Sequence, residues 1–409
     1  MIQVTPPAGT LRATVNLPLS KSMANRQLCI RYLSGSNAEY RVPDCDDSLL
    51  MQDLLNQLQS DKSSKVFNCG DAGTVFRFLA AILANTEGDW LITGSERMQQ
   101  RPCAPLVNGL NELGADVTYQ SQAGYPPLII KGSQLRGGDV FIDASVSSQF
   151  ISALMMIGAT MSEELKIVLK GNIVSKPYIE LTAWLMREQG ISVEFKNREI
   201  RVTPGFYQFK NSLAEADWSA ASYWYAAAAM AGESEFCLKG LNRNSMQGDN
   251  RLTAFYEELG VGSKWEGADL ILRNTGKVTG EYKADFTDCP DLFPAIAVTC
   301  AGLGLRSHFS GLSTLALKES DRLRSVGNEL SKLGYQISQG DDIFEIFPDR
   351  VKSHDNKIET YADHRIAMAF AMLSLASGQL FILNPTVVSK SYPDFWNHLH
   401  QAGFNLEAV

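Results

Sequence analysis

Six segments of the chain begin with polar residues and continue as almost wholly apolar stretches. They span residues 22–35, 73–88, 147–158, 217–232, 291–302 and 363–378. After the first turn nearly every position in these stretches is apolar, whereas a surface helix keeps one polar face. The pattern therefore predicts six helices that are buried on most of their sides.

A second pattern recurs about every seventy residues, where an amphipathic helix ends in Gly and a strand follows. The glycines are Gly114, Gly190, Gly260, Gly334 and Gly403. Gly is the expected residue just past a helix, because it adopts a positive φ without strain. Short β-branched or aromatic runs at 89–93, 165–169, 199–202, 343–347 and 380–383 predict strands between the helices.

The two patterns together predict an α/β chain of six repeated units, three in each of two domains. The starts of the apolar stretches differ by 51, 74, 70, 74 and 72 residues, so we expect the first unit to be shortened. A period of this length exceeds that of solenoid repeats, which favours duplication of a subdomain over an open array. Chance similarity among the units of an α/β chain is the alternative.

Charge and cysteine content exclude several classes of function. The net charge of −8 argues against a nucleic-acid partner, because binding to phosphate backbones needs a basic surface. Seven scattered cysteines without a CxxC pair indicate a reducing compartment and neither a disulfide framework nor a zinc site. No signal peptide is visible and no apolar stretch is long enough to span a bilayer, so we expect a cytoplasmic protein with no membrane partner.

The starts of the six apolar helices concentrate polar and charged residues. Ser, Thr and Asp at such places are explained as N-caps. Lys21, Arg26, Arg77 and Arg365 are not, because a cation opposes the positive end of the helix dipole. Each of them needs either a buried acid or an anionic ligand, and helix N-termini suit phosphate.

Further cations lie in short polar segments between the units, and each alone fits an ordinary surface charge. They are Arg97, Arg101, Lys318, Arg322, Arg324 and Lys390. Glu319 lies between Lys318 and Arg322, and a carboxylate beside two cations could act in proton transfer; the alternative is an ordinary i, i+3 ion pair with Arg322. The sequence has no GxSxG or P-loop motif. The residues alone thus predict a site that gathers cations and a few carboxylates around anionic small molecules.

Eight segments resemble the 5-enolpyruvylshikimate-3-phosphate synthase family of enolpyruvyl transferases. They are residues 19–26, 69–77, 97–102, 145–150, 174–180, 315–323, 361–370 and 387–395, and include LSKSMANR, CGDAGTVFR and YADHRIAMAF. The resemblance implies two domains, each of three βαβαββ units around buried helices like an inside-out α/β barrel, with the active site in the interdomain cleft. We expect the shikimate-3-phosphate-side domain at 20–217 and the second domain at 1–19 and 218–409, with the chain crossing near 19–20 and 216–218.

The resemblance also implies a reaction and its residues. The enolpyruvyl group of phosphoenolpyruvate passes to the 5-hydroxyl of shikimate 3-phosphate by addition and elimination, without a metal or another cofactor. Residues that match the shikimate 3-phosphate contacts are Lys21, Ser22, Arg26, Ser147, Ser148, Gln149, Ser175, Tyr178, Asp291 and Lys318. Those that match the phosphoenolpyruvate contacts are Lys21, Gly73, Thr74, Arg101, Gln149, Arg322, Arg365 and Lys390. The implied catalytic residues are Lys21, Asp291, Glu319 and Lys390, with Asp291 beside the attacking hydroxyl and Glu319 near the methylene that gains a proton.

The chain departs from the family pattern at Leu19, Asp71 and Thr314, where Gly, Asn and often Asn are usual. Asp71 adds negative charge beside the phosphate pocket unless Arg77 pairs with it. The family's Gly is kept at Gly73, which predicts sensitivity to phosphonate inhibitors of the glyphosate type.

We expect a monomer that acts on two small-molecule substrates. The sequence leaves three other functions open. One is the sister transferase acting on UDP-N-acetylglucosamine, although its loop Cys precedes the Arg-Pro pair and Cys103 follows it here. A second is a non-catalytic ligand-binding relative. The third is an RNA-end-processing protein, which the acidic balance disfavours.

Overall fold

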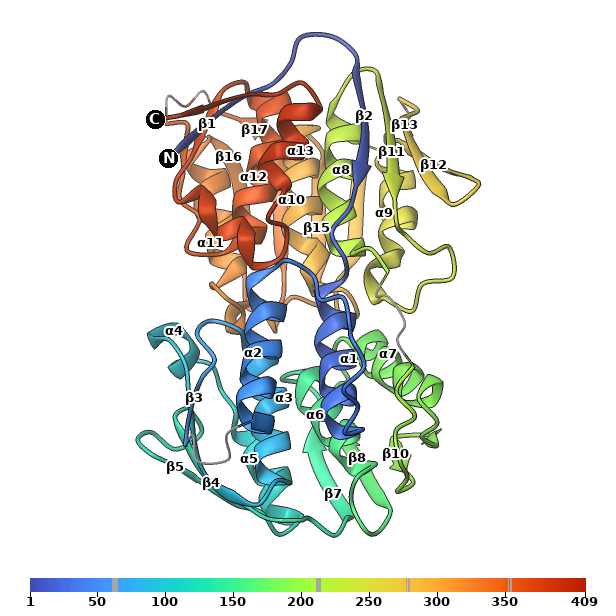
Figure 1. Cartoon of the computed structure of the whole chain (residues 1–409). Coiled ribbons are helices and arrows are strands. Elements are labelled where there is room, and N and C mark those ends of the chain that lie inside the picture. The colour runs from blue at the N-terminus through green and yellow to red at the C-terminus, as the bar shows by residue number, and fades with distance from the viewer. Residues whose placement is uncertain (61–64, 211–214, 277, 279, 352, 354) are drawn as a thin grey trace. The chain divides into compact units, whose positions relative to one another are not determined.

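The computed structural model describes the chain except residues 61–64, 211–214, 277, 279, 352 and 354. It divides into two compact units, which are Met1–Ser20 with Glu215–Val409 (unit 1) and Lys21–Ala214 (unit 2). Both units are drawn in Figure 1. Among the described residues, no helix is long and apolar enough to cross a membrane.

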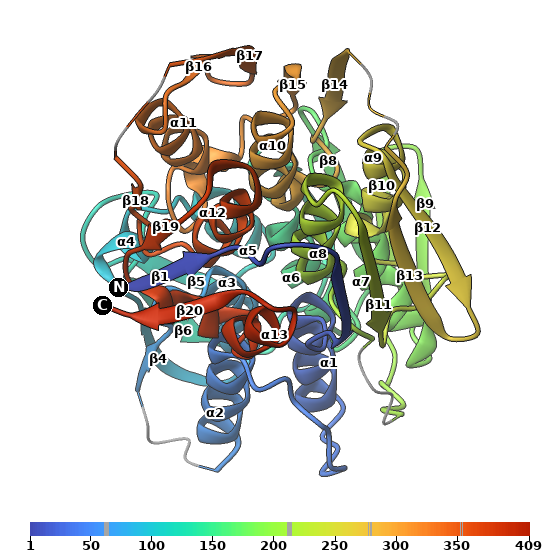
Figure 2. The same ribbon diagram turned by 90° about the horizontal axis from the view of Figure 1, so that it is seen from above.

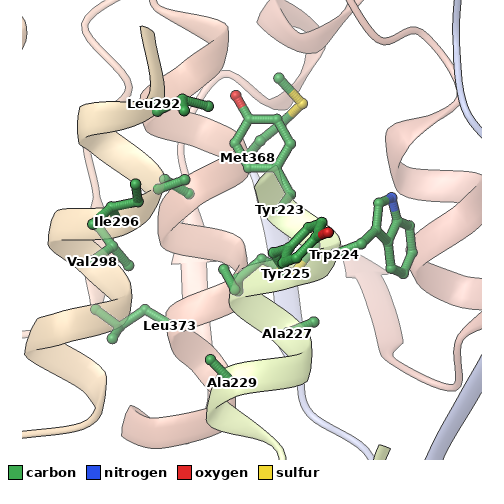
Figure 3. Close-up of a cluster of buried hydrophobic side chains, with 14 of the residues drawn as sticks. Tyr223, Trp224, Tyr225, Ala227, Ala229, Leu292, Ile296, Val298, Met368 and Leu373 are labelled. Carbon is green, nitrogen blue, oxygen red and sulfur yellow. The ribbon is translucent and has the colours of Figure 1, made fainter. Parts of the chain in front are cut away.

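Three helices form the centre of unit 1 and pack against one another. They are α8 (Trp218–Met230), α10 (Phe293–Gly302) and α12 (His364–Ser377). Figure 3 shows Tyr223 of α8 close to Met368 of α12, with Ile296 and Val298 projecting from α10. The α8 helix is buried at every position from Trp218 to Ala229. The apolar stretches of unit 1 are therefore buried helices, as their pattern predicts.

Three four-stranded sheets belong to unit 1. The first contains β2 (Leu11–Asn16), β11 (Ser234–Lys239), β12 (Val261–Glu266) and β13 (Asp269–Asn274). The second contains β14 (Glu281–Asp285), β15 (Arg306–Ser310), β16 (Tyr335–Gln339) and β17 (Phe344–Arg350). The third contains β18 (Lys357–Ile358), β19 (Leu380–Ile382), β20 (Asn405–Ala408) and β1 (Ile2–Thr5).

Each sheet of unit 1 packs on its own central helix: α8 on the first, α10 on the second and α12 on the third. Three further helices complete the unit, namely α9 (Leu252–Glu258), α11 (Arg322–Lys332) and α13 (Phe395–Gln401). Four 3-10 turns precede or follow them, η1 (Gly248–Arg251), η2 (Pro290–Leu292), η3 (Leu315–Leu317) and η4 (Pro385–Lys390).

Unit 2 repeats this plan around α1 (Lys21–Leu33), α3 (Gly73–Ala84) and α6 (Ser148–Gly158), which pack against one another. One sheet contains β3 (Val66–Asn68), β4 (Gly88–Thr93), β5 (Asp116–Tyr119) and β6 (Leu128–Gly132). The other contains β7 (Gly138–Asp143), β8 (Leu165–Lys170), β9 (Val193–Lys196) and β10 (Glu199–Val202). The remaining helices are α2 (Asp46–Ser60), α4 (Glu96–Gln99), α5 (Ala104–Glu112) and α7 (Lys176–Glu188).

All five sheets have the same strand order, and each belongs to one βαβαββ repeat. The first strand pairs parallel to the second, and an antiparallel pair completes the sheet. This pair is a hairpin in β7-β8-β10-β9, whereas in β18-β19-β1-β20 it joins strands from the two ends of the chain. The mixed α/β class is confirmed, but the described strands form separate sheets and do not close into a barrel. In place of a sixth complete repeat, α1 and α2 pack as a helix pair. The runs at 199–202 and 343–347 lie in the closing hairpins and not between the helices of a repeat.

The recurring glycines end the second helix of their repeats, as predicted. Gly114, Gly190, Gly260, Gly334 and Gly403 all have φ between +81° and +99°. At Gly334 a Cβ would also lie 1.9 Å from the carbonyl oxygen of Val351. A side chain there would meet both a strained backbone and a steric clash, so the position requires Gly.

The N-terminal strands tie the two ends of unit 1 together. Figure 2 shows β1 between β19 and β20, and it pairs antiparallel with both. Past β2, Leu19 forms an isolated bridge with Ala216, and Ser20 N donates to Glu215 O at 2.7 Å. The chain therefore leaves unit 1 and returns to it at neighbouring points.

Candidate active site

Six charged side chains of unit 1 form one connected group, which we call the carboxylate–cation cluster. The members are Asp291 in η2, Lys318 and Glu319 after η3, Arg322 at the start of α11, and Asp363 and Arg365 at the start of α12. Each lies where a helix or a 3-10 turn begins or ends. The fold thus brings together side chains that are up to 74 residues apart in sequence.

Arg322 lies at the centre of the cluster, and its side chain is 1% exposed. Its Nη1 is 2.6 Å from Asp291 Oδ1, its Nη2 is 2.6 Å from Glu319 Oε2, and its Nε is 2.8 Å from Asp363 Oδ2. A planar guanidinium with five donors suits this divergent contact with three carboxylates. The surface-charge interpretation of Arg322 is wrong, and its pairing with Glu319 is confirmed.

Asp291 forms ion pairs with three cations. Besides Arg322, Lys318 Nζ lies 3.3 Å from Oδ1 and Arg365 Nη2 lies 2.9 Å from Oδ2. Burial would raise the pKa of Asp291, but Arg365, Lys318 and Arg322 outweigh it and hold that pKa well below its usual value. Burial lowers the pKa of Lys318 even though Asp291 opposes this. Asp291 is therefore firmly ionised.

The start of α12 is held in a strained backbone conformation. Tyr361 and Ala362 have φ of 52° and 54°, in the left-handed region that non-Gly residues rarely adopt. Asp363 then caps the helix by accepting from Arg365 N at 2.9 Å. The N-cap role accounts for one carboxylate oxygen of Asp363, and the second oxygen, Oδ2, contacts Arg322. One carboxylate thus both starts the helix and positions a cation.

Lys390 is buried at the end of η4, which packs against α12. The sequence pattern is compatible with a surface charge at this position, but the burial of Lys390 shows that this interpretation is wrong. Arg101 is also buried, whereas the side chain of Arg324 is 78% exposed and is a surface charge. Arg97 is partly exposed. Sequence pattern did not separate these cations, because burial here depends on tertiary packing.

In unit 2, Gly73 at the start of α3 lies beside three polar side chains that are joined by hydrogen bonds. Arg77 Nη1 donates to Gln149 Oε1 at 2.8 Å, and Gln149 Nε2 donates to Thr74 Oγ1 at 3.0 Å. A Cβ added to Gly73 would lie 2.4 Å from Arg77 Nη1 and 2.6 Å from Arg101 Nη1. Two guanidinium groups therefore converge on the face of Gly73, at a helix N-terminus, where an anion is favoured.

Asp71 lies beside this group, in the turn before α3. Its carboxylate accepts a hydrogen bond from Ser95 Oγ, and its carbonyl oxygen is 3.5 Å from Arg101 Nη1. The hydroxyl of Ser95 is therefore one group that stabilises the negative charge that Asp71 adds.

Arg26 is enclosed by hydroxyl and carbonyl groups. It donates to Thr182 Oγ1 at 2.7 Å, to Ser22 O at 2.8 Å and to Ser152 Oγ at 3.3 Å. Burial lowers the pKa of Arg26 to about 10, with Tyr178 and Cys29 acting in the opposite direction. A buried guanidinium held by neutral groups keeps a net positive charge, which suits an anionic ligand.

Lys21 forms the first residue of α1 and is paired with a buried acid. Its Nζ is 2.9 Å from Asp47 Oδ2, and the two side chains are 11% and 5% exposed. The sequence predicts that a cation at this helix start needs a buried acid or a ligand, and the structure shows a buried acid. Asp47 was not identified from the sequence, because it lies 26 residues away on α2.

The remaining predicted residues of unit 2 lie at two further helix starts. Ser147 caps α6 by accepting from Gln149 N, and Ser148 is buried beside it. Ser175 precedes α7 with φ of 52°, and its carbonyl accepts from Tyr178 N at 3.0 Å. The predicted site residues therefore form two sets, one in each unit, and all except Arg26, in the second turn of α1, lie at or near the start or the end of a helix or a 3-10 turn.

Comparison with known proteins identifies one family. A family model described as EPSP synthase (3-phosphoshikimate 1-carboxyvinyltransferase) matches residues 6–399. A 3-phosphoshikimate 1-carboxyvinyltransferase of Bacteroides fragilis is 42% identical over 401 residues, which cover 97% of each chain. One of Photobacterium damsela subsp. piscicida is 36% identical and covers 97% of this chain and 98% of its own.

Solved structures agree on the fold. An EPSP synthase structure from Acinetobacter baumannii superposes with a TM-score of 0.75 over 100% of both chains, at 20% sequence identity. At this identity the likeness concerns the fold alone.

Proposed function

The chain belongs to the EPSP synthase family, and from this premise we propose that it transfers the enolpyruvyl group of phosphoenolpyruvate to the 5-hydroxyl of shikimate 3-phosphate. The hydroxyl oxygen bonds to C2 of phosphoenolpyruvate while C3 gains a proton. The C2–O bond to phosphate then breaks, and C3 loses a proton to restore the double bond. The observation that carries this proposal is the convergence of three cations on Asp291, because it supplies both a base and a set of anion-binding groups.

In this proposal the carboxylate of phosphoenolpyruvate binds Arg322 and Arg365. Both guanidiniums now contact Asp291, so the substrate replaces a protein carboxylate as their partner. With fewer cations beside it, Asp291 gains a higher pKa and becomes a better base for the 5-hydroxyl. Glu319, on the other side of Arg322, is proposed to exchange the proton at C3.

The phosphate of phosphoenolpyruvate is proposed to bind at Gly73, Thr74, Arg101 and Gln149, with Lys21 and Lys390 as further cations. Guanidinium pairs and a helix N-terminus stabilise the charge that grows on the departing phosphate. Shikimate 3-phosphate is proposed to bind the other predicted residues, Ser22, Arg26, Ser147, Ser148, Ser175, Tyr178 and Lys318. The two domains of this proposal are 20–217, and 1–19 with 218–409.

The test is phosphate release from phosphoenolpyruvate, with and without shikimate 3-phosphate, in buffer that contains EDTA. We expect release only when both substrates are present and no effect of the chelator. UDP-N-acetylglucosamine in place of shikimate 3-phosphate should give no release. Tight binding of shikimate 3-phosphate without any release would instead favour a binding-only relative, with Asp71 and Leu19 as the first positions to exchange.

We also propose that the protein is a cytoplasmic monomer. Seven free thiols support a reducing compartment. A net charge of −8 supports a monomer, because copies with the same charge repel one another. Light scattering coupled to size-exclusion chromatography should give the mass of one chain, 45.0 kDa. Twice that mass would contradict the monomer.

A further inference from the structure

A buried carboxyl group lies next to the carboxylate–cation cluster and has no role in the reaction described above. Asp249, in η1, is 1% exposed. Its Oδ2 accepts a hydrogen bond from Ser219 Oγ, and its Oδ1 has no hydrogen-bond partner among the described residues. Burying a carboxylate with one oxygen unsatisfied is costly, so packing alone is a poor explanation for this residue.

Ser219 connects this carboxyl group to Arg365. Its Oγ lies 3.4 Å from Arg365 Nη2, the same nitrogen that is 2.9 Å from Asp291 Oδ2. A hydroxyl can accept one hydrogen bond and donate another, so the chain runs from Arg365 through Ser219 to Asp249. The Nε of Arg365 is buried and has no hydrogen-bond partner in the part of the chain that the structure describes. The guanidinium of Arg365 is thus held through Nη2, and its Nε–H remains available as a hydrogen-bond donor to a ligand.

On the basis of the proposed function, we propose that Asp249, acting through Ser219, positions Arg365 for the carboxylate of phosphoenolpyruvate and weakens that binding when Asp249 is ionised. Asp249 is a positioning residue in this role, because it contacts Ser219 and not the substrate. A negative charge behind the guanidinium competes with the incoming carboxylate for the same cation.

The protonation state of Asp249 changes close to neutral pH. Burial, followed by the negative charge of Asp291, raises the pKa of Asp249 to about 6, while Arg365 and Ser219 act in the opposite direction. The charged and titratable groups that face it are Asp217 at the start of α8, Cys289 and Asp291 at η2, and Arg365 on α12. Arg251 of its own turn pairs with Asp288.

The direction of the effect follows from linkage. Below pH 6 Asp249 is largely neutral, and above it the side chain is negative. An anion bound at Arg365 adds negative charge and raises the pKa of Asp249 further, so protonation and anion binding favour each other. The KM for phosphoenolpyruvate should therefore rise as pH increases from about 5 to about 8, by roughly tenfold if the two events are coupled by one pKa unit.

The experiment compares three variants with the wild type at saturating shikimate 3-phosphate, from pH 5 to pH 8. Asp249→Asn removes the titration, and Ser219→Ala removes a hydrogen bond that lowers the pKa of Asp249. Ser222→Ala is the matched control, because it deletes another buried α8 hydroxyl, one that donates to Ser219 O at 2.6 Å. Ratios of variant to wild-type KM at each pH cancel the titration of the phosphoenolpyruvate phosphate itself.

We expect the KM ratio for Asp249→Asn to fall by about tenfold across the window, because only the wild type weakens as pH rises. In Ser219→Ala the wild-type inflection should move to higher pH, which a merely structural defect would not produce. Ser222→Ala should keep the wild-type inflection. If Asp249→Asn does not fold, the shift in Ser219→Ala carries the test.

Failure of this inference differs from failure of the proposed function. A wild type without phosphate release would reject the function itself. An active wild type whose KM profile is unchanged in both Asp249→Asn and Ser219→Ala would overturn the role of Asp249 and leave the function intact. The Kd of shikimate 3-phosphate alone, measured by calorimetry, should stay within twofold in Asp249→Asn; a large loss would also overturn the inference, because it would mean that the variant perturbs more than Arg365.

Discussion

At the scale of single residues, several buried cations of this protein are held either by an acid or by neutral hydroxyl groups. Asp291 holds Arg365 and Arg322, Asp47 holds Lys21, and neutral hydroxyls surround Arg26. A charge taken out of water costs several kcal/mol unless it is paired. The partners therefore stabilise these cations in their buried positions.

Replacing Asp291 with Asn should lower kcat by about 10²- to 10⁴-fold, because the proposed base is lost. The amide keeps the size of the carboxylate, so we expect the Kd of shikimate 3-phosphate to change much less than kcat. Steady-state kinetics and calorimetry together measure both. A variant with wild-type kcat would remove Asp291 from the mechanism.

Replacing Lys21 with Met should abolish activity and also destabilise the fold. The Lys21–Asp47 pair is almost fully buried, and removal of one partner of such a pair costs about 3–5 kcal/mol. The double variant Lys21→Met with Asp47→Asn separates the two effects in chemical unfolding and in kinetics. It should recover much of the stability but none of the activity, whereas recovered activity would assign Lys21 a structural role only.

Replacing Gly73 with Ala should weaken binding of phosphoenolpyruvate and of glyphosate. The added methyl would lie 2.4 Å and 2.6 Å from guanidinium nitrogens of Arg77 and Arg101, so these groups must shift. We expect the KM for phosphoenolpyruvate to rise by about tenfold, equivalent to about 1.4 kcal/mol. Inhibition titrations should show a glyphosate-sensitive wild type and a less sensitive variant. Full wild-type activity at high glyphosate would contradict the predicted sensitivity.

At the scale of elements, α11 carries one cation of the cluster and also fixes the turn that positions another. Arg322 is its first residue, and two turns later Glu329 is 2% exposed. Glu329 accepts from Glu359 N at 3.1 Å and from Tyr361 Oη at 2.8 Å. These bonds anchor the left-handed residues before α12. The helix thereby links Arg322 to the turn that leads to Arg365.

Two substitutions with opposite expected signs test this turn. Glu329→Ala should destabilise the protein by about 1–3 kcal/mol, because it removes the acceptor of two partly buried hydrogen bonds. Ala362→Gly should stabilise it by up to about 1 kcal/mol, since Gly accepts the φ of 54° without strain. Urea unfolding measures both. A destabilised Ala362→Gly variant would mean that the turn is not strained.

At the scale of the whole molecule, unit 2 is one continuous segment inserted into unit 1. The chain leaves unit 1 after Ser20 and returns at Glu215, and these residues are joined by a backbone hydrogen bond. Unit 2 buries its own central helices α1, α3 and α6. An inserted segment with its own core and adjoining ends is able to fold independently.

A fragment of residues 21–214 should therefore unfold cooperatively when it is produced alone. Circular dichroism during urea titration gives the transition, and residues 1–20 joined by a short Gly/Ser linker to 215–409 form the matched fragment. A gradual loss of signal without a transition in 21–214 would contradict independent folding.

The sequence alone determined the features that depend on neighbouring positions. Burial of α8 follows from its nearly continuous apolar residues, and Gly334 follows from the need for a positive φ after α11. The caps at Asp217 and Asp363 are local as well. These features depend on residues within a few positions of one another, where chain connectivity already places the groups in contact.

The tertiary structure decided which charges meet. Nothing in the local sequence separates buried Arg322 from exposed Arg324, and nothing near Lys21 indicates Asp47. The pairing of Arg365 with Asp291, and the contact of Ser219 with Asp249, join residues that are 74 and 30 positions apart. Such contacts form only after the helices have packed, because packing closes the long loops between these residues and brings them together. Burial and charge pairing therefore depend on the tertiary structure.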